Sequence, residues 1–389
     1  WNDRFRDTAR TFWLEDVDGG SDFGRISLQE MSTRLCGSAD LFATEPGRGA
    51  PASINFVSCH DGFTLTDLTR YRSKHNEANG ENNNDGSSGN HSANFGVEGV
   101  TDDPDVIAAR EQAAMNMIGM LLLSLGTPMM LAGDEFRNTQ DGNNNAYCQD
   151  NDITWLKWDW MYSTNKTREM RRLETVSRLV ALRKSLDLYH HEDFFTRLTQ
   201  LGLLKPSSRV QWFLPDGTTP MERDWFDLGV RSFTMRLLSN SEVDVCIVVN
   251  GTADDRTFRL PPDTHWTPKW CSAEINGRRA GHGTQVEECD LNGDTTVWTQ
   301  HVPDASETVL KMVKEVAMQR TESSTENEAD TIKFAMPVTD HAANGTSSAP
   351  RDEVSADMPD APVDDTPDTP VDDNVWTMPA LSITLMKQV

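Results

Sequence analysis

The residues with the clearest capacity for chemistry are His60 and Asp61, which end the apolar run FVSC and precede Gly62. Consecutive strand residues face opposite sides of a sheet, so both side chains reach one ligand only if the chain leaves strand geometry here. Gly62 makes such a turn easy. An imidazole beside a carboxylate at a strand end can bind vicinal hydroxyls of a sugar. In the alternative, structural reading, the histidine closes the strand and the aspartate caps the next helix.

Further polar and aromatic candidates follow this pair. The asparagine-rich segments 79–86 and 143–145 either line a groove through their amides or form turns. We include Asn145 among the predicted ligand-binding residues, together with Tyr147, whose ring could stack on a sugar face. The aromatic density from Tyr147 to Trp160 is more typical of a core. Asp134 and Glu135 follow an apolar run, and we expect them to support the fold through hydrogen bonds.

The elements that must position these residues alternate along the first half of the chain. Helical spacing predicts helices at residues 3–13, 64–74, 105–125 and 166–185, the third capped by Asp103 and opened by Pro104. Two apolar runs without strict alternation, 54–59 and 128–132, suit strands covered on both faces. This order indicates an α/β fold with parallel strands. Both runs end in polar residues, and active sites of (β/α) barrels lie at the carboxyl ends of strands.

Beyond about residue 193 the pattern changes to short β-prone runs. They are separated by turn signals such as Asn-Gly, and they occupy residues 210–213, 232–237, 243–249, 257–260 and 295–298. Residues 376–386 are β-prone again. We predict an all-β sandwich over residues 193–302 and 375–389, with the last run as its final strand.

The stretch between these β-prone parts is strongly acidic. Residues 303–374 contain 17 acidic and 5 basic residues, a net charge of −12 out of a total of −25. Large apolar side chains are few, so the segment cannot bury enough surface to offset the entropy of ordering. We therefore predict a disordered acidic insertion at residues 303–374.

Composition narrows the classes of partner and site. The formal charge of −25 argues against nucleic acid and anionic membranes as main partners. Gly126 and Pro128 interrupt the apolar stretch 115–132, which favours a buried helix and strand over a membrane span. The six cysteines include no Cys-x-x-Cys pair and no zinc-like spacing, so we expect neither metal nor cofactor. Scattered reduced thiols favour a cytoplasmic location.

Bacterial isoamylase-type glycogen debranching enzymes, members of the α-amylase superfamily (glycoside hydrolase family 13), resemble this chain in consecutive segments. These segments are NFVSCHDGFTLTDL, KHNEANGENNNDG, LLLSLGTPMMLAGDEF and GNNNAYCQDNDITWL, and WNDRFRDTARTFW is similar as well. The resemblance is near-continuous to about residue 230. It implies a retaining hydrolase of α-1,6 branch linkages in glycogen or a related branched α-glucan. It also implies a (β/α)8 TIM barrel followed by a β-sandwich domain.

The resemblance further implies roles for single residues. Family members use an aspartate nucleophile, a glutamate acid/base and a third carboxylate that grips the sugar. Asp61 matches the third carboxylate and His60 the histidine before it. Such a carboxylate stabilises the positive charge that develops on the sugar ring in the transition state. Residues 1–192 would then be the C-terminal portion of the barrel, about strands six to eight.

The nucleophile and the acid/base have no counterpart in this sequence, because in the family they precede the segment that begins here as WNDRFRD. We therefore expect the chain to be the C-terminal part of a larger enzyme and to be inactive by itself. Two alternatives stay open. One is a non-catalytic glucan-binding or regulatory protein made from a degenerate barrel. The other is a different activity of the superfamily, such as transglycosylation or trehalose-releasing hydrolysis.

Overall fold

The computed structural model describes residues 1–14, 17, 24–43, 47–189, 210–238, 244–262, 265–282, 285, 287–288, 374–379 and 382–388. They all belong to one compact unit, Trp1–Leu310 with Asp372–Val389; a second unit, Lys311–Val371, lies outside the described residues. Apart from Asn374, the predicted insertion at 303–374 also lies outside them, as does the strand predicted at 295–298. The predicted domain boundaries stay predictions.

Three long helices form at the predicted places: α1 (Asp3–Leu14), α5 (Pro104–Leu123) and α6 (Arg168–Ser185). The Asp103 carboxylate accepts hydrogen bonds from the N–H groups of Asp105 and Val106 at 2.9 and 3.3 Å, which confirms the predicted cap of α5. By length and composition alone α5 could cross a membrane, but 78% of its apolar window is buried inside the protein. It is therefore a core helix.

Shorter helices link these elements, and one of them corrects a prediction. The helix expected over residues 64–74 ends at Leu68. The Thr69 hydroxyl donates to the Thr66 carbonyl at 3.0 Å, a local hydrogen bond that competes with further helical bonding. The short helices are α2 (Leu28–Leu35), α3 (Ala39–Phe42), α4 (Leu65–Leu68) and α8 (Glu222–Phe226), with the 3-10 helices η2 (Ala50–Ala52), η3 (Glu77–Asn79), η4 (Asp134–Phe136), η5 (Asp159–Tyr162), η6 (Asp187–Tyr189) and η7 (Ser272–Asn276).

The parallel strands are shorter than predicted. β1 (Ile54–Asn55) pairs in parallel with β2 (Thr127–Pro128), and Asn2 forms a single parallel bridge with Asn55 on the other side. The predicted strand 54–59 is therefore wrong beyond Asn55, although Phe56, Val57 and Ser58 are buried. The predicted buried strand 128–132 is also wrong beyond Pro128, because residues 129–131 are only half-buried and Ala132 is exposed.

Two antiparallel sheets pack face to face in the second half of the chain. The larger has the order β3 (Val210–Phe213), β4 (Ser232–Leu237), β5 (Val245–Asn250), β12 (Ser382–Gln388) and β7 (Trp266–Cys271). The smaller has the order β6 (Arg256–Arg259), β11 (Val375–Met378) and β9 (Gly281–His282), while β10 (Glu287–Glu288) pairs with β8 (Arg278–Arg279). Side chains from both sheets form one buried cluster, which includes Cys246, Val248, Phe258, Trp376, Met378 and Met386.

The last β-prone run forms two strands where one was predicted. β11 lies in the middle of the smaller sheet and β12 in the middle of the larger one, so the segment links the two sheets. A strand that was not predicted, β7, contains Pro268. It lies at the edge of the larger sheet, where a residue without an N–H is tolerated.

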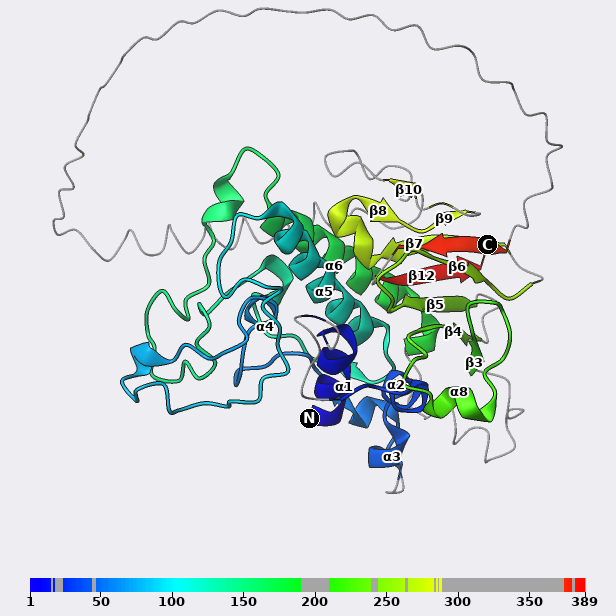
Figure 1. The fold of residues 1–389 in the computed structure, drawn as a ribbon, viewed down its shortest axis with the longest axis horizontal. Helices are drawn as coiled ribbons and strands as arrows, with labels where there is room; N and C mark the ends of the chain where they lie inside the picture. Colours follow the sequence, from blue (N-terminus) through cyan, green and yellow to red (C-terminus); the bar gives the residue numbers. More distant parts are fainter. Residues whose placement is uncertain are drawn as a thin grey trace, which may run out of the picture. The chain divides into compact units, whose positions relative to one another are not determined.

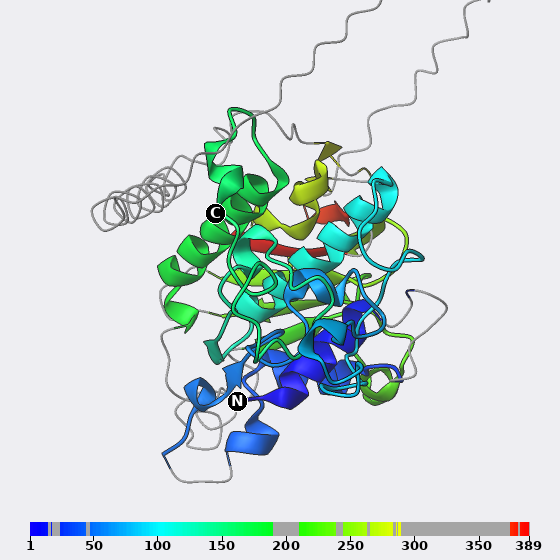
Figure 2. The ribbon, with the colours of Figure 1, turned by 90° about the vertical axis from the view of Figure 1, so that its left-hand side faces the viewer.

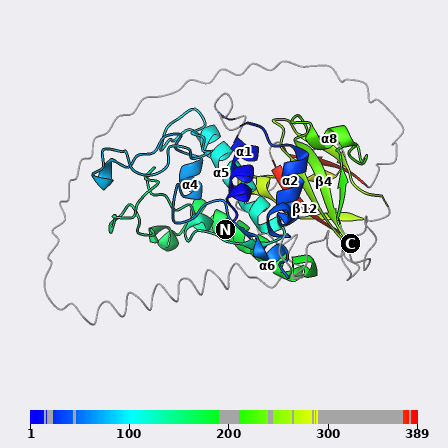
Figure 3. The same cartoon turned by 90° about the horizontal axis from the view of Figure 1, so that it is seen from below.

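The helices cover the other face of the larger sheet. Val245, Ile247 and Val249 of β5 point into the cluster that contains α1 and α5, while Cys246 and Val248 point between the sheets. Figure 1 shows α5 and α6 beside β5 and β12, and Figure 3 shows α1, α2 and α5 next to the sheet from below. The two predicted domains thus share one hydrophobic core. The long loops before α5 and after η4 lie away from the sheet and face the viewer in Figure 2.

Candidate active site

His60 and Asp61 lie where the buried β1 run reaches the surface. Their side chains are 67% and 79% exposed, and the His60 Nε2 is 3.3 Å from the Asp61 Oδ2. The strand ends earlier, at Asn55, and Gly62, with a φ of +89°, lies in the bend that contains His60 and Asp61. The ring of Trp1, itself 60% exposed, meets the His60 ring edge-on at 5.4 Å between centroids. The two candidate groups are therefore adjacent and accessible to a ligand.

The segment that carries this pair is held at several points. The buried Asp134 carboxylate accepts hydrogen bonds from the Ser58 hydroxyl and from the Leu65 N–H. Between these points the Gly62 N–H donates to the Asn144 carbonyl at 3.0 Å. Burial raises the pKa of Asp134 to about 7, even though its hydrogen bonds favour the charged form. The prediction that Asp134 supports the fold through hydrogen bonds is confirmed.

The two asparagine-rich loops are joined to each other by side-chain hydrogen bonds. Asn76 donates to the Asn144 side-chain oxygen at 2.9 Å, and Asn143 donates to that of Asn79 at 2.8 Å. Asp85 accepts from Asn79 at 2.7 Å and from Asn145 at 2.9 Å, and the first of these bonds contributes most to its lowered pKa. We call these residues the amide clamp: Asn76, Asn79, Asp85, Asn143, Asn144 and Asn145.

The amide clamp joins two loops that are far apart in sequence, a role that lies outside both readings of the asparagine-rich segments. Asn145, one of the predicted ligand-binding residues, belongs to this clamp. Its amide nitrogen already donates a hydrogen bond to Asp85. Tyr147, the other, is 71% exposed beside the amide clamp. The ligand-binding roles of both residues stay predictions.

The remaining aromatic residues of this region form a small stack. Phe136 lies 4.8 Å from the Trp158 ring and 5.3 Å from the Trp160 ring, measured between centroids. Trp155 is 55% exposed and its indole N–H donates to Asp150 at 3.0 Å. The aromatic density is therefore divided between a partly buried stack and exposed rings.

A buried ion cluster behind this region has no local sequence signal. The Glu111 carboxylate of α5 lies 2.8 Å from both Arg172 of α6 and Arg137. Burial by itself would raise the pKa of Glu111, but the two guanidinium groups outweigh it and the pKa is lowered. Only tertiary structure brings these three residues together, since they are distant in the chain.

Metal-ligating and thiol chemistry are not evident in the part of the chain that the structure describes. It contains no group of three or more His, Cys, Asp or Glu side chains arranged to hold a metal ion. Its five cysteines are free, and burial raises the pKa of Cys36 and Cys271 to about 12. The Cys59 thiol, next to His60, donates to the Asp61 carbonyl at 3.3 Å.

No family model matches the chain. Among solved structures, a pullulanase from Bacillus acidopullulyticus is 18% identical with a TM-score of 0.44, covering 75% of this chain and 28% of its own. The GBS pullulanase SAP in complex with maltotetraose is 12% identical with a TM-score of 0.48, covering 99% of this chain and 38% of its own.

Curated proteins match at higher identity. A "Glycogen operon protein GlgX homolog" of Mycobacterium bovis is 42% identical over 239 residues, 60% of this chain and 31% of the relative. A glycogen debranching enzyme of Pectobacterium atrosepticum is 38% identical over 293 residues, 75% of this chain and 40% of the relative. The chain thus spans well under half the length of these relatives. Over the matched residues, it is a homologue of glycogen debranching enzymes and GlgX proteins, as its motifs predicted.

Proposed function

We propose that this chain forms part of a glycoside hydrolase that cleaves α-1,6-glucosidic branch linkages in glycogen or limit dextrin with retention of configuration. One observation carries the proposal. It is the exposed His60–Asp61 pair at the end of a buried run, in a chain 38% identical over 75% of its length to a protein named glycogen debranching enzyme. The free cysteines of the described residues support a cytoplasmic location for this enzyme.

Each predicted site residue has a role in this proposal. Asp61 is the anion that holds sugar hydroxyls and stabilises positive charge on the ring as the glycosidic bond breaks. His60, 3.3 Å away, binds a neighbouring hydroxyl. Asn145 and Tyr147 extend the sugar-binding surface, Tyr147 by stacking. The nucleophile and the acid/base come from polypeptide outside this chain, and the retaining mechanism requires their carboxyl groups to lie about 5–5.5 Å apart.

We further propose that residues 1–192 are the last part of a (β/α)8 barrel, and that the sandwich spans residues 193–302 and 375–389. The parallel pairings support this, because Asn2, β1 and β2 lie side by side in chain order. Helices lie between successive strands, as the barrel requires. In this arrangement His60 and Asp61 follow the seventh strand.

The test replaces Asp61 in the complete gene product that contains this chain. We expect Asp61→Asn to lower turnover on glycogen at least about 100-fold, because a preorganised charge at the reacting sugar is lost. The midpoint of thermal unfolding should not change, since the side chain is exposed. Asp141→Asn, at an exposed carboxylate of a nearby loop, is the matched control and should keep its turnover within twofold.

Product analysis separates the alternatives. Release of linear chains from branched but not linear glucans supports debranching, whereas new linkages or trehalose would identify another superfamily activity. Glucan binding without any product from the complete gene product would favour the non-catalytic reading. We expect the 389-residue chain alone to release nothing.

A further inference from the structure

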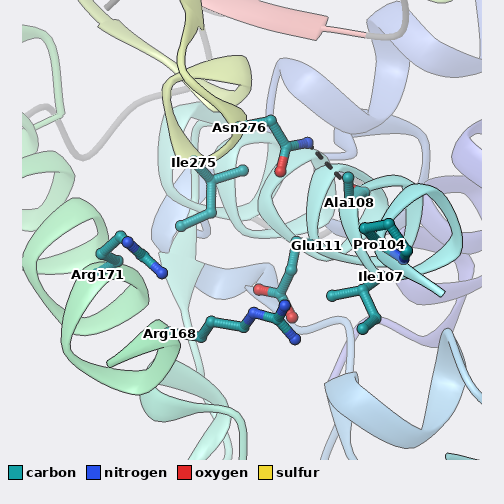
Figure 4. Close-up of a pocket in the computed structure, with 8 residues that line it drawn as sticks. All are labelled: Pro104, Ile107, Ala108, Glu111, Arg168, Arg171, Ile275 and Asn276. Carbon is teal, nitrogen blue, oxygen red and sulfur yellow. Dashed lines mark hydrogen bonds between the residues drawn. The ribbon is translucent and has the colours of Figure 1, made fainter. Parts of the chain in front are cut away.

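Two adjoining hollows lie where α5 and α6 begin. The first is about 190 Å³ in volume, and its lining includes Pro104, Glu111, Arg168 and Arg171 (Figure 4). The second, which we call the arginine pocket, is about 240 Å³, and its charged lining residues are Arg70, Asp102, Arg110, Glu111, Arg137 and Arg168. None of these residues belongs to the candidate active site or to the amide clamp.

The arginine pocket concentrates positive charge on an acidic protein. Four arginines and two carboxylates line it, while the whole chain has a formal charge of −25. One of the carboxylates, Glu111, is already paired with Arg137 of the pocket and with Arg172, which leaves Arg70, Arg110 and Arg168 against Asp102. The guanidinium of Arg110 donates to the backbone carbonyls of Asn94, Val97 and Gly99, which fixes its position. The excess positive charge is therefore built into the pocket.

Two of the four guanidinium groups, those of Arg70 and Arg168, can still donate hydrogen bonds to a ligand. Within the described residues, neither Arg70 nor Arg168 makes a side-chain hydrogen bond or ion pair. Arg168 is exposed, and Figure 4 shows its side chain extending from α6 towards Glu111 of α5. Arg70 is half-buried, and its pKa is lowered first by burial and then by the charge of Arg137. An anion beside Arg70 would offset both effects.

The surrounding backbone adds to the attraction for an anion. α6, of 18 residues, begins at Arg168 of the arginine pocket, and α5, of 20 residues, begins at Pro104 of the adjoining hollow, so the positive ends of both dipoles lie close to the pocket. The volume is below the roughly 300–1,000 Å³ of pockets that enclose larger organic ligands. A small ligand fits these dimensions.

We propose that the arginine pocket binds a phosphate group, free or as a small phosphate monoester, through the guanidinium groups of Arg70 and Arg168. Guanidinium presents several N–H donors in a planar fork that matches phosphate oxygens. A doubly charged tetrahedral anion can use both groups at once, whereas a carboxylate satisfies one fork. The inference does not depend on the proposed function, because it uses no residue of the candidate active site.

The test measures inorganic phosphate binding to the 389-residue chain by isothermal titration calorimetry in buffer free of other oxyanions. We expect saturable binding at one site, weakened at least about tenfold by Arg168→Gln because a charge-assisted contact is lost. Arg171→Gln is the matched control, since Arg171 stands one turn further along α6 and lines only the first hollow. It should change the dissociation constant less than twofold.

A second variant distinguishes a lost binding site from an unfolded protein. Arg70→Gln should abolish binding, yet leave the phosphate-free unfolding midpoint unchanged or higher, because burial and the repulsion from Arg137 outweigh the attraction of Asp67 and Glu111 for the charged side chain. A hexose phosphate that binds more tightly than inorganic phosphate would identify the monoester as the ligand; equal or weaker binding would identify free phosphate. The proposal is overturned by the absence of saturable binding, by equal weakening in Arg168→Gln and Arg171→Gln, or by acetate binding as tightly as phosphate.

Discussion

The Asp134 carboxylate accepts a hydrogen bond from the Leu65 N–H at 2.9 Å, across 69 residues of sequence. The same carboxylate accepts a hydrogen bond from the Ser58 hydroxyl. Leu65 and Ser58 stand on either side of the segment that carries His60 and Asp61. One buried side chain of η4 therefore holds both ends of the candidate active-site segment.

This arrangement predicts a pH-dependent stability. The unfolded chain releases the Asp134 proton near pH 3.8, whereas the folded protein holds it to about pH 7. Between these values the folded state binds more protons, so the free energy of unfolding falls as pH rises, by up to about 1.4 kcal/mol per pH unit. The loss is complete above pH 7. Urea unfolding at several pH values from 4 to 8 measures it.

Asp134→Asn isolates this contribution. An amide has nearly the same shape, can still accept from the Leu65 N–H and does not titrate, so the variant should show a flatter decline than wild type across the same window. Other groups titrate in both proteins, so their contributions to the free energy of unfolding cancel in the comparison. Parallel curves for the two proteins would show that the buried carboxylate keeps an ordinary pKa.

The amide clamp predicts contrasting effects at two glycines. Gly86 and Gly80 both have positive φ, +72° and +79°, so alanine costs about 1–2 kcal/mol of strain at either position. A Cβ at Gly86 would also collide with the Asn144 Oδ1 and lie 2.7 Å from the Asn76 Nδ2, whereas Gly80 has open space. Gly86→Ala should cost at least about 2 kcal/mol more than Gly80→Ala, since it breaks a buried hydrogen bond.

Urea unfolding and protease sensitivity of the two loops measure this difference. Equal destabilisation by both substitutions would mean that the loops are not held against each other through Asn76 and Asn144.

The buried ion cluster predicts a large effect at Glu111. Glu111→Gln leaves Arg172, which is 1% exposed, without its carboxylate partner and should cost about 3–5 kcal/mol of unfolding free energy. Glu169→Gln is the matched control, because Glu169 contacts the same Arg137 at 3.4 Å but is 29% exposed. It should cost less than about 1 kcal/mol. Comparable losses in chemical denaturation of the two variants would refute a buried pairing of Glu111.

The close approach of α5 to the larger sheet predicts an unusual response at Gly119. Alanine normally stabilises a helix by about 1 kcal/mol over glycine. A Cβ at Gly119 would lie 2.7 Å from Ile383 and 2.9 Å from Trp270, so overpacking of about 1–3 kcal/mol should outweigh that gain. Thermal unfolding of Gly119→Ala tests this. A raised midpoint would mean that helix and sheet are further apart.

Much of the local structure follows from sequence pattern. The amphipathic spacing of α1 and α6, the Asp103 cap of α5, and the strands β3 and β4 agree with prediction because each depends on residues close in the chain. The bend at His60 and Asp61 was also expected, since Gly62, which follows them, has the positive φ that a sharp turn uses. The motifs also identified the homologous proteins.

Pairing and burial across long distances in the chain required the tertiary structure. The run 376–386 reads as one strand, and only the contacts with β5, β6, β7 and β9 divide it between two sheets. The asparagines have a sequence pattern typical of turns. In the structure they form the amide clamp, because two loops meet around Asp85. Arg70 and Arg168 have no sequence signal that joins them. Sequence patterns reflect neighbours within a few residues, whereas desolvation and charge pairing depend on which distant segments the fold brings together.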